Sequence, residues 1–222
     1  MKTITAILLA YYPERAKDIH EIVKVLKEGT RPPDKIIIFN NNPELSFNIS
    51  GVTSIQSSEN LGCGIRFALA LGIKSDYFYF IDDDMCPESG TIENFEKYAH
   101  KKCCFSYLGK KLLKGIPYSK TEAVWSNIIK NPIDIDIMVG VGGMFCSYEA
   151  LVNMYNLENK YKDMKEYDFG RNTDIILSRA NSCKLIPFKE GSGIHKFPVT
   201  DTGLCLEKNH GKKRDAITSL IF

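Results

Sequence analysis

Three consecutive carboxylates, Asp82, Asp83 and Asp84, directly follow a run of five apolar or aromatic residues at positions 77–81. The run is short, rich in strand formers and without helical periodicity, which predicts a buried central strand. In open α/β sheets, ligands bind at the carboxyl ends of the strands. Strand alternation predicts that Asp82 and Asp84 face one side and Asp83 the other, so that Asp82 and Asp84 can share one ligand.

Three neighbouring like charges are most simply compensated by a bound divalent cation. Hard carboxylate oxygens suit Mg²⁺ or Mn²⁺, and such ions commonly hold phosphate groups. The chemistry that this acidic triplet indicates is therefore the binding of a phosphorylated ligand through a cation. An acidic turn after a strand is the alternative, because Asp is common in turns.

Repeating β-α units precede the triplet and would place it at a sheet edge. The spacing of apolar residues from Ala16 to Glu28 predicts an amphipathic helix, which Gly29 and the following prolines end. A strand on either side of this helix makes a β-α-β unit and predicts a parallel sheet with a right-handed crossover. The strands predicted in this half are Thr3 to Ala10, Lys35 to Phe39, Val52 to Gln56 and the apolar run itself, with a second helix from Ile65 to Gly72.

The rest of the chain continues the α/β pattern with less regular spacing. Residues 110–132 are basic and irregular, and they fit either a loop over the site or a pair of strands. Residues 207–214 are polar and basic, and they fit either a solvated tail or a segment that closes over a bound ligand. The other predicted elements are helices at 89–101, 148–156 and 172–180, strands at 103–108, 133–141 and 184–188, and a loop at 166–170. With no linker or repeat, we expect a single α/β domain over residues 1–222, divided into a nucleotide-binding half (1–85) and an acceptor-side half (86–222).

The composition is that of an ordinary soluble globular protein, with 44% hydrophobic and 25% charged residues. A formal net charge of +2 gives no strong field, so no nucleic-acid partner is expected. The apolar runs are too short to span a bilayer, and the N-terminus does not read as a signal peptide. Seven cysteines without a C-x-x-C pair indicate reduced thiols, neither a disulfide framework nor a zinc site. These features predict a cytoplasmic protein without an integral membrane segment.

Short motifs that could surround a nucleotide follow one another in a particular order. They are Tyr-Tyr-Pro-Glu-Arg at 11–15, Asn-Asn-Asn at 40–42, Asn-Leu-Gly-Cys-Gly-Ile-Arg at 60–66, Phe-Ile-Asp-Asp-Asp at 80–84, Gly-Gly-Met-Phe at 142–145 and Thr-Asp-Ile-Ile-Leu-Ser-Arg at 173–179. In this order they resemble the glycosyltransferases of GT-A fold, especially the inverting family 2 type, over residues 3–188.

This resemblance implies a Rossmann-like, mostly parallel central sheet flanked by helices. It also implies a nucleoside diphosphate sugar as donor, most of all a UDP-sugar, and Mn²⁺ or Mg²⁺ as cofactor. The implied reaction moves the sugar to a hydroxyl group of a glycan or another acceptor, with inversion at the anomeric carbon.

The first two motifs resemble the segments that line the nucleotide base. The resemblance assigns Tyr11, Tyr12 and Arg15 to the base, since an aromatic face and a fixed donor suit a flat polar ring. A surface turn with one buried tyrosine is the alternative. Asn40 stands where many relatives carry an Asp that bonds the base, and its amide both donates and accepts. An Asn-rich turn is the alternative for Asn40.

The next two motifs resemble the segments around the ribose and the diphosphate. Asn60 and Gly62 would bring backbone close to the nucleotide, and Arg66 begins a helix whose N-terminus favours phosphate. A surface helix charge is the alternative for Arg66. Asp82 and Asp83 are assigned to the nucleotide.

The same resemblance assigns the metal ligands and the catalytic general base. Asp84 would bind the metal, and His195, which follows the last predicted strand, would complete its shell; a solvated loop histidine is the alternative. Asp174 is the candidate general base that takes the proton of the acceptor hydroxyl. Relatives usually carry Glu before this Asp, whereas this chain has Thr173. A helix N-cap is the alternative role for Asp174.

The acceptor pocket is assigned to Gly142 and Gly143 as its floor and to Trp125 as a face for stacking a sugar, with a core tryptophan as the alternative. Two other functions remain open. A sugar nucleotidyltransferase would share the sheet and the acids, but no Gly-rich triphosphate loop lies near the N-terminus. A non-catalytic module that binds a nucleotide sugar or a carbohydrate is the other, and the departure at Thr173 keeps it open.

Overall fold

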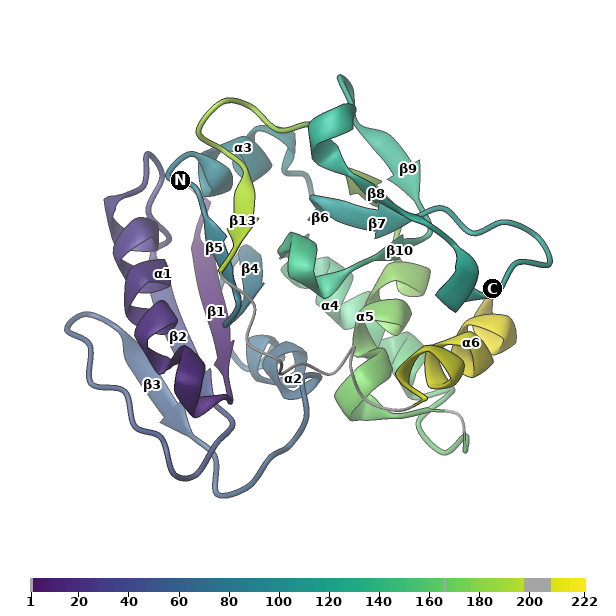
Figure 1. Cartoon of the computed structure of the whole chain (residues 1–222), viewed down its shortest axis with the longest axis horizontal. Coiled ribbons are helices and arrows are strands. Elements are labelled where there is room, and N and C mark those ends of the chain that lie inside the picture. Colours follow the sequence, from purple (N-terminus) through teal and green to yellow (C-terminus); the bar gives the residue numbers. More distant parts are fainter. Residues whose placement is uncertain (1, 166, 198–208) are drawn as a thin grey trace.

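An eight-stranded mixed sheet forms the centre of the computed structural model, in the order β3-β2-β1-β4-β11-β6-β12-β9. Figure 1 shows its first four strands, β3, β2, β1 and β4, side by side. The structure describes residues 2–165, 167–197 and 209–222. Within the described residues, no helix is both long enough and apolar enough to cross a membrane. Helices lie on both faces of the sheet, so the α/β class predicted from the sequence is confirmed.

The first four strands of this sheet are parallel, as predicted. They are β1 (Ile4–Ala10), β2 (Lys35–Asn40), β3 (Thr53–Gln56) and β4 (Tyr77–Asp82). In register, Ala10 pairs with Asn40 and Leu9 with Asp82. The carboxyl ends of the strands are therefore level, and the residues that follow them meet at one edge.

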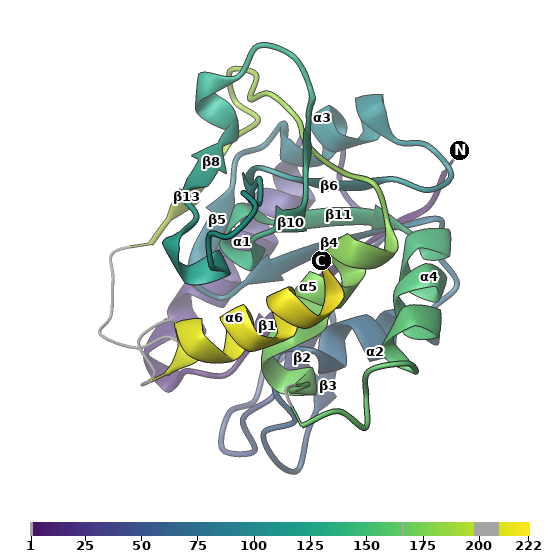
Figure 2. The ribbon, with the colours of Figure 1, turned by 90° about the vertical axis from the view of Figure 1, so that its right-hand side faces the viewer.

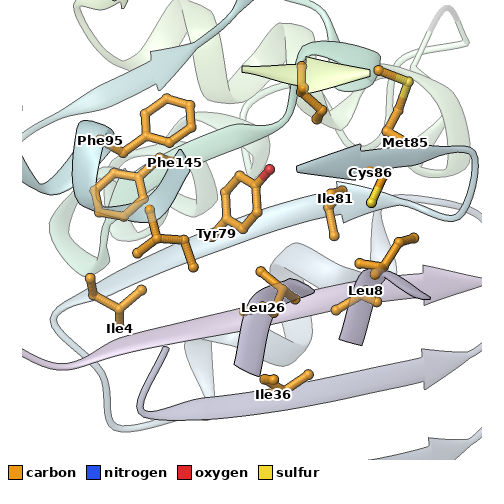
Figure 3. Close-up of a cluster of buried hydrophobic side chains, with 14 of the residues drawn as sticks. Ile4, Leu8, Leu26, Ile36, Tyr79, Ile81, Met85, Cys86, Phe95 and Phe145 are labelled. Atoms are coloured by element: carbon orange, nitrogen blue, oxygen red, sulfur yellow. The ribbon is translucent and has the colours of Figure 1, made fainter. Parts of the chain in front are cut away.

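Strand alternation divides the core into two clusters, one on each face of the sheet. On β4, Tyr77, Tyr79 and Ile81 pack into one cluster, and Phe78 and Phe80 into the other. The first cluster, shown in Figure 3, is covered by α1 (Ala16–Glu28) and α3 (Thr91–Tyr98). The second is covered by α2 (Ile65–Leu71), α4 (Tyr148–Glu158), α5 (Phe169–Ala180) and α6 (His210–Ile221).

The second half of the sheet contains a strand that the sequence did not predict. β11 (Met144–Ser147) lies antiparallel between β4 and β6 (Cys104–Ser106), and β12 (Cys183–Leu185) and β9 (Ile133–Ile135) complete the sheet. The glycines before Met144 favoured a loop, but the four residues of β11 are buried on both faces. A strand of four residues is too short for hydrophobic periodicity to distinguish it from a loop.

Two small antiparallel sheets surround the carboxyl edge of the main sheet. One contains β10 (Ile137–Met138), β7 (Leu108–Lys110) and β8 (Ala123–Trp125), so the basic region 110–132 contributes a strand, together with the 3₁₀ turns Tyr118–Lys120 and Ser126–Ile128. The other pairs β5 (Met85–Pro87) with β13 (Ile194–Lys196). The strand predicted at 184–188 is therefore not the last one, and His195 lies in a strand, because backbone pairing with β5 extends this segment.

Two C-terminal predictions were wrong. α5 begins at Phe169, within the predicted loop, so Asp174 lies in the second turn of the helix and is not its N-cap. Residues 210–221 form helix α6, which packs beside α5 (Figure 2), so the predicted tail is helical from residue 210. Arg214 is buried, and the solvated-tail interpretation is wrong for it, whereas Lys212 and Lys213 are exposed. Residues 207 and 208 of that prediction lie outside the described residues. The buried side chains of α6 recur at helical spacing: Arg214, Ile217, Thr218 and Ile221.

Candidate functional site

A cavity of about 1200 Å³ opens at the carboxyl edge of β1 and β4. Its volume exceeds that of an ordinary small-molecule pocket and suits an extended ligand. The N-terminal half forms one end of the cavity, and α5, α6 and the region around β7 form the other. Its charged lining residues are Arg15, Arg66, Asp82, Asp83, Asp84, Lys110, Asp168, Arg171, Asp174, Lys196 and Arg214.

The acidic triplet lines the cavity, and two buried arginines hold it. Arg66 from α2 pairs with Asp82, and Arg15 lies with Nη1 2.7 Å from Asp83 Oδ1 and 3.7 Å from Asp84 Oδ2. Asp83 and Asp84 thus approach the same cation. The predicted alternation, with Asp83 opposite Asp84, is wrong because β4 ends at Asp82 and the next two residues form a turn.

Arg66 and Arg15 are 4% and 6% exposed, so the surface-charge interpretation of Arg66 is wrong. Burial by itself lowers the pKa of Arg66, but the carboxylate of Asp82 and, more weakly, that of Asp174 outweigh it and raise that pKa. Arg66 therefore interacts electrostatically with carboxylates from both ends of the cavity. Its Nε is buried and has no hydrogen-bond partner within the described chain.

Asp83 acts mainly as the support of Arg15. Burial raises the pKa of Asp83 to about 6, although Arg15 and the backbone N–H of Tyr11 oppose the shift. Its Oδ2 accepts a hydrogen bond from that N–H at 3.2 Å. One carboxylate thus connects the turn after β1 to the end of β4.

Asp84 is the residue best arranged to bind a cation. Burial raises the pKa of Asp84, Asp82 raises it further, and Arg15 and Lys196 oppose the shift. Its Oδ1 is buried and accepts no hydrogen bond from the described residues. A cation beside this oxygen would satisfy it and stabilise the charged form.

The residues fit a cation held jointly with a ligand. No group of three or more His, Cys, Asp or Glu side chains able to hold a metal occurs among the described residues. His195 is exposed and does not line the cavity, whereas its neighbour Lys196 does. Mg²⁺ and Mn²⁺ are commonly bound through one or two carboxylates together with substrate phosphates and water, and Asp84 and Asp82 suit that mode.

The turn after β1 provides two aromatic rings to the cavity. Tyr11 and Tyr12 are half-buried and meet edge to face, with ring centroids 5.0 Å apart. The Arg15 guanidinium lies 4.6 Å from the centre of the Tyr12 ring, so this arginine has an aromatic contact as well as its carboxylates. Both tyrosines line the cavity, and the assignment of their rings to a nucleotide base stays a prediction.

Asn40 does not line the cavity. Its side chain is fully buried and donates hydrogen bonds to the carbonyl of Leu45 and to Gln56 Oε1, both at 2.7 Å. The next residue, Asn41, does line the cavity. Asn41 takes the place predicted for Asn40 because β2 ends at Asn40, one residue later than predicted.

Asn41 also holds the loop that contains Asn60 and Gly62. Its Nδ2 donates to Asn60 Oδ1 at 2.7 Å, and its Oδ1 accepts from the Leu61 N–H at 2.8 Å. Gly62 has a φ of +76°, a conformation that favours glycine. The predicted residues of this loop therefore lie together at the cavity, held by an amide that the sequence did not single out.

Asp174 lies at the other end of the cavity and pairs with Arg214 of α6. Arg214 Nη2 donates to Asp174 Oδ2 at 2.8 Å, and Nη1 donates to Oδ1 at 3.1 Å. The Asp174 side chain is 15% exposed and that of Arg214 is 7% exposed. The sequence had placed Arg214 in a basic tail, and the apolar residues three and seven positions after it were the signal for a packed helix.

Gly142, Gly143 and Trp125 do not line the cavity. A Cβ atom at Gly142 would collide with Leu108, and one at Gly143 would lie 3.0 Å from the Tyr79 hydroxyl, so close packing explains both glycines. Trp125 is 38% exposed on β8. Gly140, two residues before Gly142 in the same 3₁₀ turn, does line the cavity.

Several residues that line the cavity were not singled out from the sequence. Lys110 is one: its Nζ lies 4.1 Å from the centre of the Tyr118 ring, and burial, followed by the charge of Arg214, lowers its pKa. No short motif signals such residues, because they come from separate elements. The others are Tyr118, Ser119, Asp168, Arg171, Lys196, His210 and Gly211.

Solved structures of similar fold are glycosyltransferases. Residues 1–349 of TarS from S. aureus, in complex with UDP-GlcNAc, match with a TM-score of 0.59 at 12% identity, over 93% of this chain and 61% of that one. GalNAc-T7 with UDP, GalNAc and Mn²⁺ matches with a TM-score of 0.65 at 10% identity, over 90% of this chain and 45% of that one. This chain thus spans less than two thirds of either protein.

No protein-family model matches the sequence, and no curated protein matches it significantly. At 10–12% identity, the structural likeness shows the fold. The neighbours are GT-A glycosyltransferases, and the GT-A fold that the order of motifs implied is confirmed.

Proposed function

We propose that this protein is a glycosyltransferase that moves a sugar from a UDP-sugar to a hydroxyl acceptor with inversion. The single observation that carries the proposal is one cavity with two distinct ends. Arginine-held carboxylates and tyrosines line the end at the sheet edge, and Asp174 lines the other. The structural neighbours support the choice of donor, since one contains UDP-GlcNAc and another UDP with GalNAc.

The donor would lie across the sheet-edge end. Tyr11 and Tyr12 provide an apolar surface for the base, and Arg66 and Arg15 provide the positive charge that a diphosphate requires. The buried Nε of Arg66 is a donor that a phosphate oxygen would satisfy. Asp84 and Asp82 would hold a divalent cation, which neutralises charge on the leaving phosphate; Mn²⁺ accompanies UDP in GalNAc-T7.

Asp174 would act as the base. In the reaction, the bond from the anomeric carbon to the phosphate oxygen breaks, a bond to the acceptor oxygen forms, and the hydroxyl proton passes to Asp174. Attack from the face opposite the leaving group inverts the anomeric carbon, through a transition state of oxocarbenium character.

Nucleotide binding and transfer are tested together. Thermal unfolding is recorded with UDP, GDP or dTDP, with and without Mn²⁺, and UDP with Mn²⁺ is expected to raise the Tm most. UDP release from a panel of UDP-sugars then identifies the donor. Asp174→Asn should keep the UDP-dependent rise in Tm and lose about 10²- to 10⁴-fold in transfer rate. The absence of stabilisation by any nucleoside diphosphate would overturn the proposal.

A non-catalytic module that binds nucleotide sugars is the second candidate. Both carboxylate oxygens of Asp174 are already hydrogen-bonded to Arg214, which is also what a purely structural pair would show. In that case UDP would bind, but no UDP-sugar would be turned over with any acceptor. Transfer that persists unchanged in Asp174→Asn would instead remove Asp174 from the role of base.

A further inference from the structure

Helix α6 brings one cation into the acceptor-side end of the cavity and fixes it there. The Arg214 guanidinium lies 4.6 Å from the centre of the Tyr118 ring, and its Nη1 also donates to the Arg171 carbonyl at 2.8 Å. On the same helix, Asp215 bonds the backbone N–H and the hydroxyl of Ser119, both at 2.7 Å. The Tyr118 ring, the Arg171 carbonyl and the Asp174 carboxylate therefore hold the guanidinium in one orientation, and the bonds of Asp215 fix the helix against Ser119.

The hydrogen bonds to Asp174 leave one position on its carboxylate open. A carboxylate accepts at about four lone-pair positions, two on each oxygen. Oδ1 accepts from the Ile175 N–H at 2.9 Å and from Arg214 Nη1, and Oδ2 accepts from Arg214 Nη2. Within the described chain, three positions are filled and one on Oδ2 remains. The side chain lines the cavity and is partly exposed, so a hydroxyl group can reach that position.

We propose that Arg214 is a positioning residue, which fixes the carboxylate of Asp174 so that the open Oδ2 position faces the acceptor hydroxyl. The inference rests on the proposed function, because it assigns Asp174 the role of base. Arg214 acts only through Asp174. The planar guanidinium fork sets both the position and the rotation of a carboxylate, whereas a lysine ammonium is a point charge that leaves the rotation free.

The test compares Arg214→Ala and Arg214→Lys with wild type in steady-state transfer. A small misplacement of a reacting group costs about 10²-fold, so Arg214→Ala is expected to lower kcat by about that factor with the donor KM changed by less than about twofold. Arg214→Lys restores charge without the fork and should recover only part of the loss. Guanidinium ion at millimolar concentration should rescue Arg214→Ala and leave Arg214→Lys unchanged.

Arg179→Ala is the matched control. Arg179 also joins α5 to α6, because its Nε donates to the Ile221 carbonyl at 2.6 Å and its guanidinium lies 5.4 Å from the centre of the Phe222 ring, but it does not line the cavity. This variant removes an arginine contact between the same helices without changing Asp174. We expect its kcat to stay close to that of wild type.

The outcomes separate this inference from the proposed function. If wild type transfers sugar but Arg214→Ala keeps its kcat or becomes faster, Arg214 does not position the base and the inference is overturned. An equal loss in Arg179→Ala, or no rescue by guanidinium, also overturns it, since either result indicates a general role in holding α6. If wild type binds UDP and transfers nothing, the proposed function itself fails.

Discussion

At the scale of single residues, each carboxylate of the acidic triplet has a different environment. Asp82 pairs with a helix arginine, Asp83 supports Arg15, and Asp84 keeps a buried oxygen that no described residue satisfies. The three adjacent residues therefore differ in their contacts, because Arg66 pairs with Asp82 and Arg15 lies closer to Asp83 than to Asp84. Their types were visible in the sequence, but their partners come from segments 16 to 72 positions away.

Cys63 offers a direct test of the cavity at this scale. Burial raises the pKa of the Cys63 thiol to about 11, and Cys63 lines the cavity, whereas the other described cysteines are buried elsewhere. Because the thiolate is the reactive form, alkylation by iodoacetamide should still rise about tenfold per pH unit at pH 9–10, where an ordinary thiol begins to level off. In a Cys205→Ser background, UDP with Mn²⁺ should slow this labelling.

The control is the same protein unfolded in urea, in which Cys63 should react as an ordinary thiol and UDP should have no effect. A labelling rate in the folded protein that levels off near pH 9 would show that burial does not raise the pKa of Cys63. A rate that saturating UDP leaves unchanged would show that Cys63 does not line the nucleotide site.

At the scale of elements, regular segments were predictable and short ones were not. The helix from Ala16 to Glu28 was predicted with its observed bounds, because its apolar stripe, Gly29 and the prolines agree. β11, β13 and α6 were missed or misassigned: the two strands have three or four residues, and α6 has a polar N-terminal turn. Most of the predicted site residues at the sheet edge line the cavity together. The predicted site residues that do not line it are Asn40, Trp125, Gly142, Gly143 and His195.

A substitution at Gly142 distinguishes a role in the acceptor pocket from a role in packing. A Cβ atom there would lie 2.7 Å from the Leu108 Cβ and 2.8 Å from the Ser106 Oγ, between β11 and the β6–β7 segment. Backbone at Leu108 cannot move aside easily, so Gly142→Ala should lower the free energy of unfolding by about 1–3 kcal/mol. Urea unfolding measures the change.

Gly72→Ala is the matched control, because a Cβ there would lie 3.5 Å from the Leu69 carbonyl oxygen, an ordinary contact. It should change stability by less than about 0.5 kcal/mol. If Gly142→Ala keeps wild-type stability but binds acceptor poorly, the packing explanation is wrong and Gly142 belongs to the acceptor pocket.

At the scale of the whole molecule, one aromatic stack connects the two halves of the chain. Phe95 of α3 is fully buried, with its ring 4.5 Å from Tyr107, 5.4 Å from Phe145 of β11 and 5.8 Å from Tyr79 of β4, measured between centroids. Figure 3 shows Phe95, Phe145 and Tyr79 in the cluster on this face of the sheet. None of these four side chains lines the cavity, so stability and ligand binding are built from different residues.

This separation predicts that stability can be lowered without loss of nucleotide affinity. Phe95→Ala should lower the free energy of unfolding by about 3–5 kcal/mol, because it removes a fully buried ring. The gain from a ligand depends only on its concentration relative to Kd, so UDP with Mn²⁺ at 100 times Kd should add about 2.7 kcal/mol to wild type and variant alike. Ile128→Ala, at an exposed apolar residue, should change neither quantity. Urea unfolding with and without UDP measures the free energy of unfolding and its increase on UDP binding. A Phe95→Ala protein that folds but is not stabilised by UDP would show that the aromatic stack and the sheet edge are coupled.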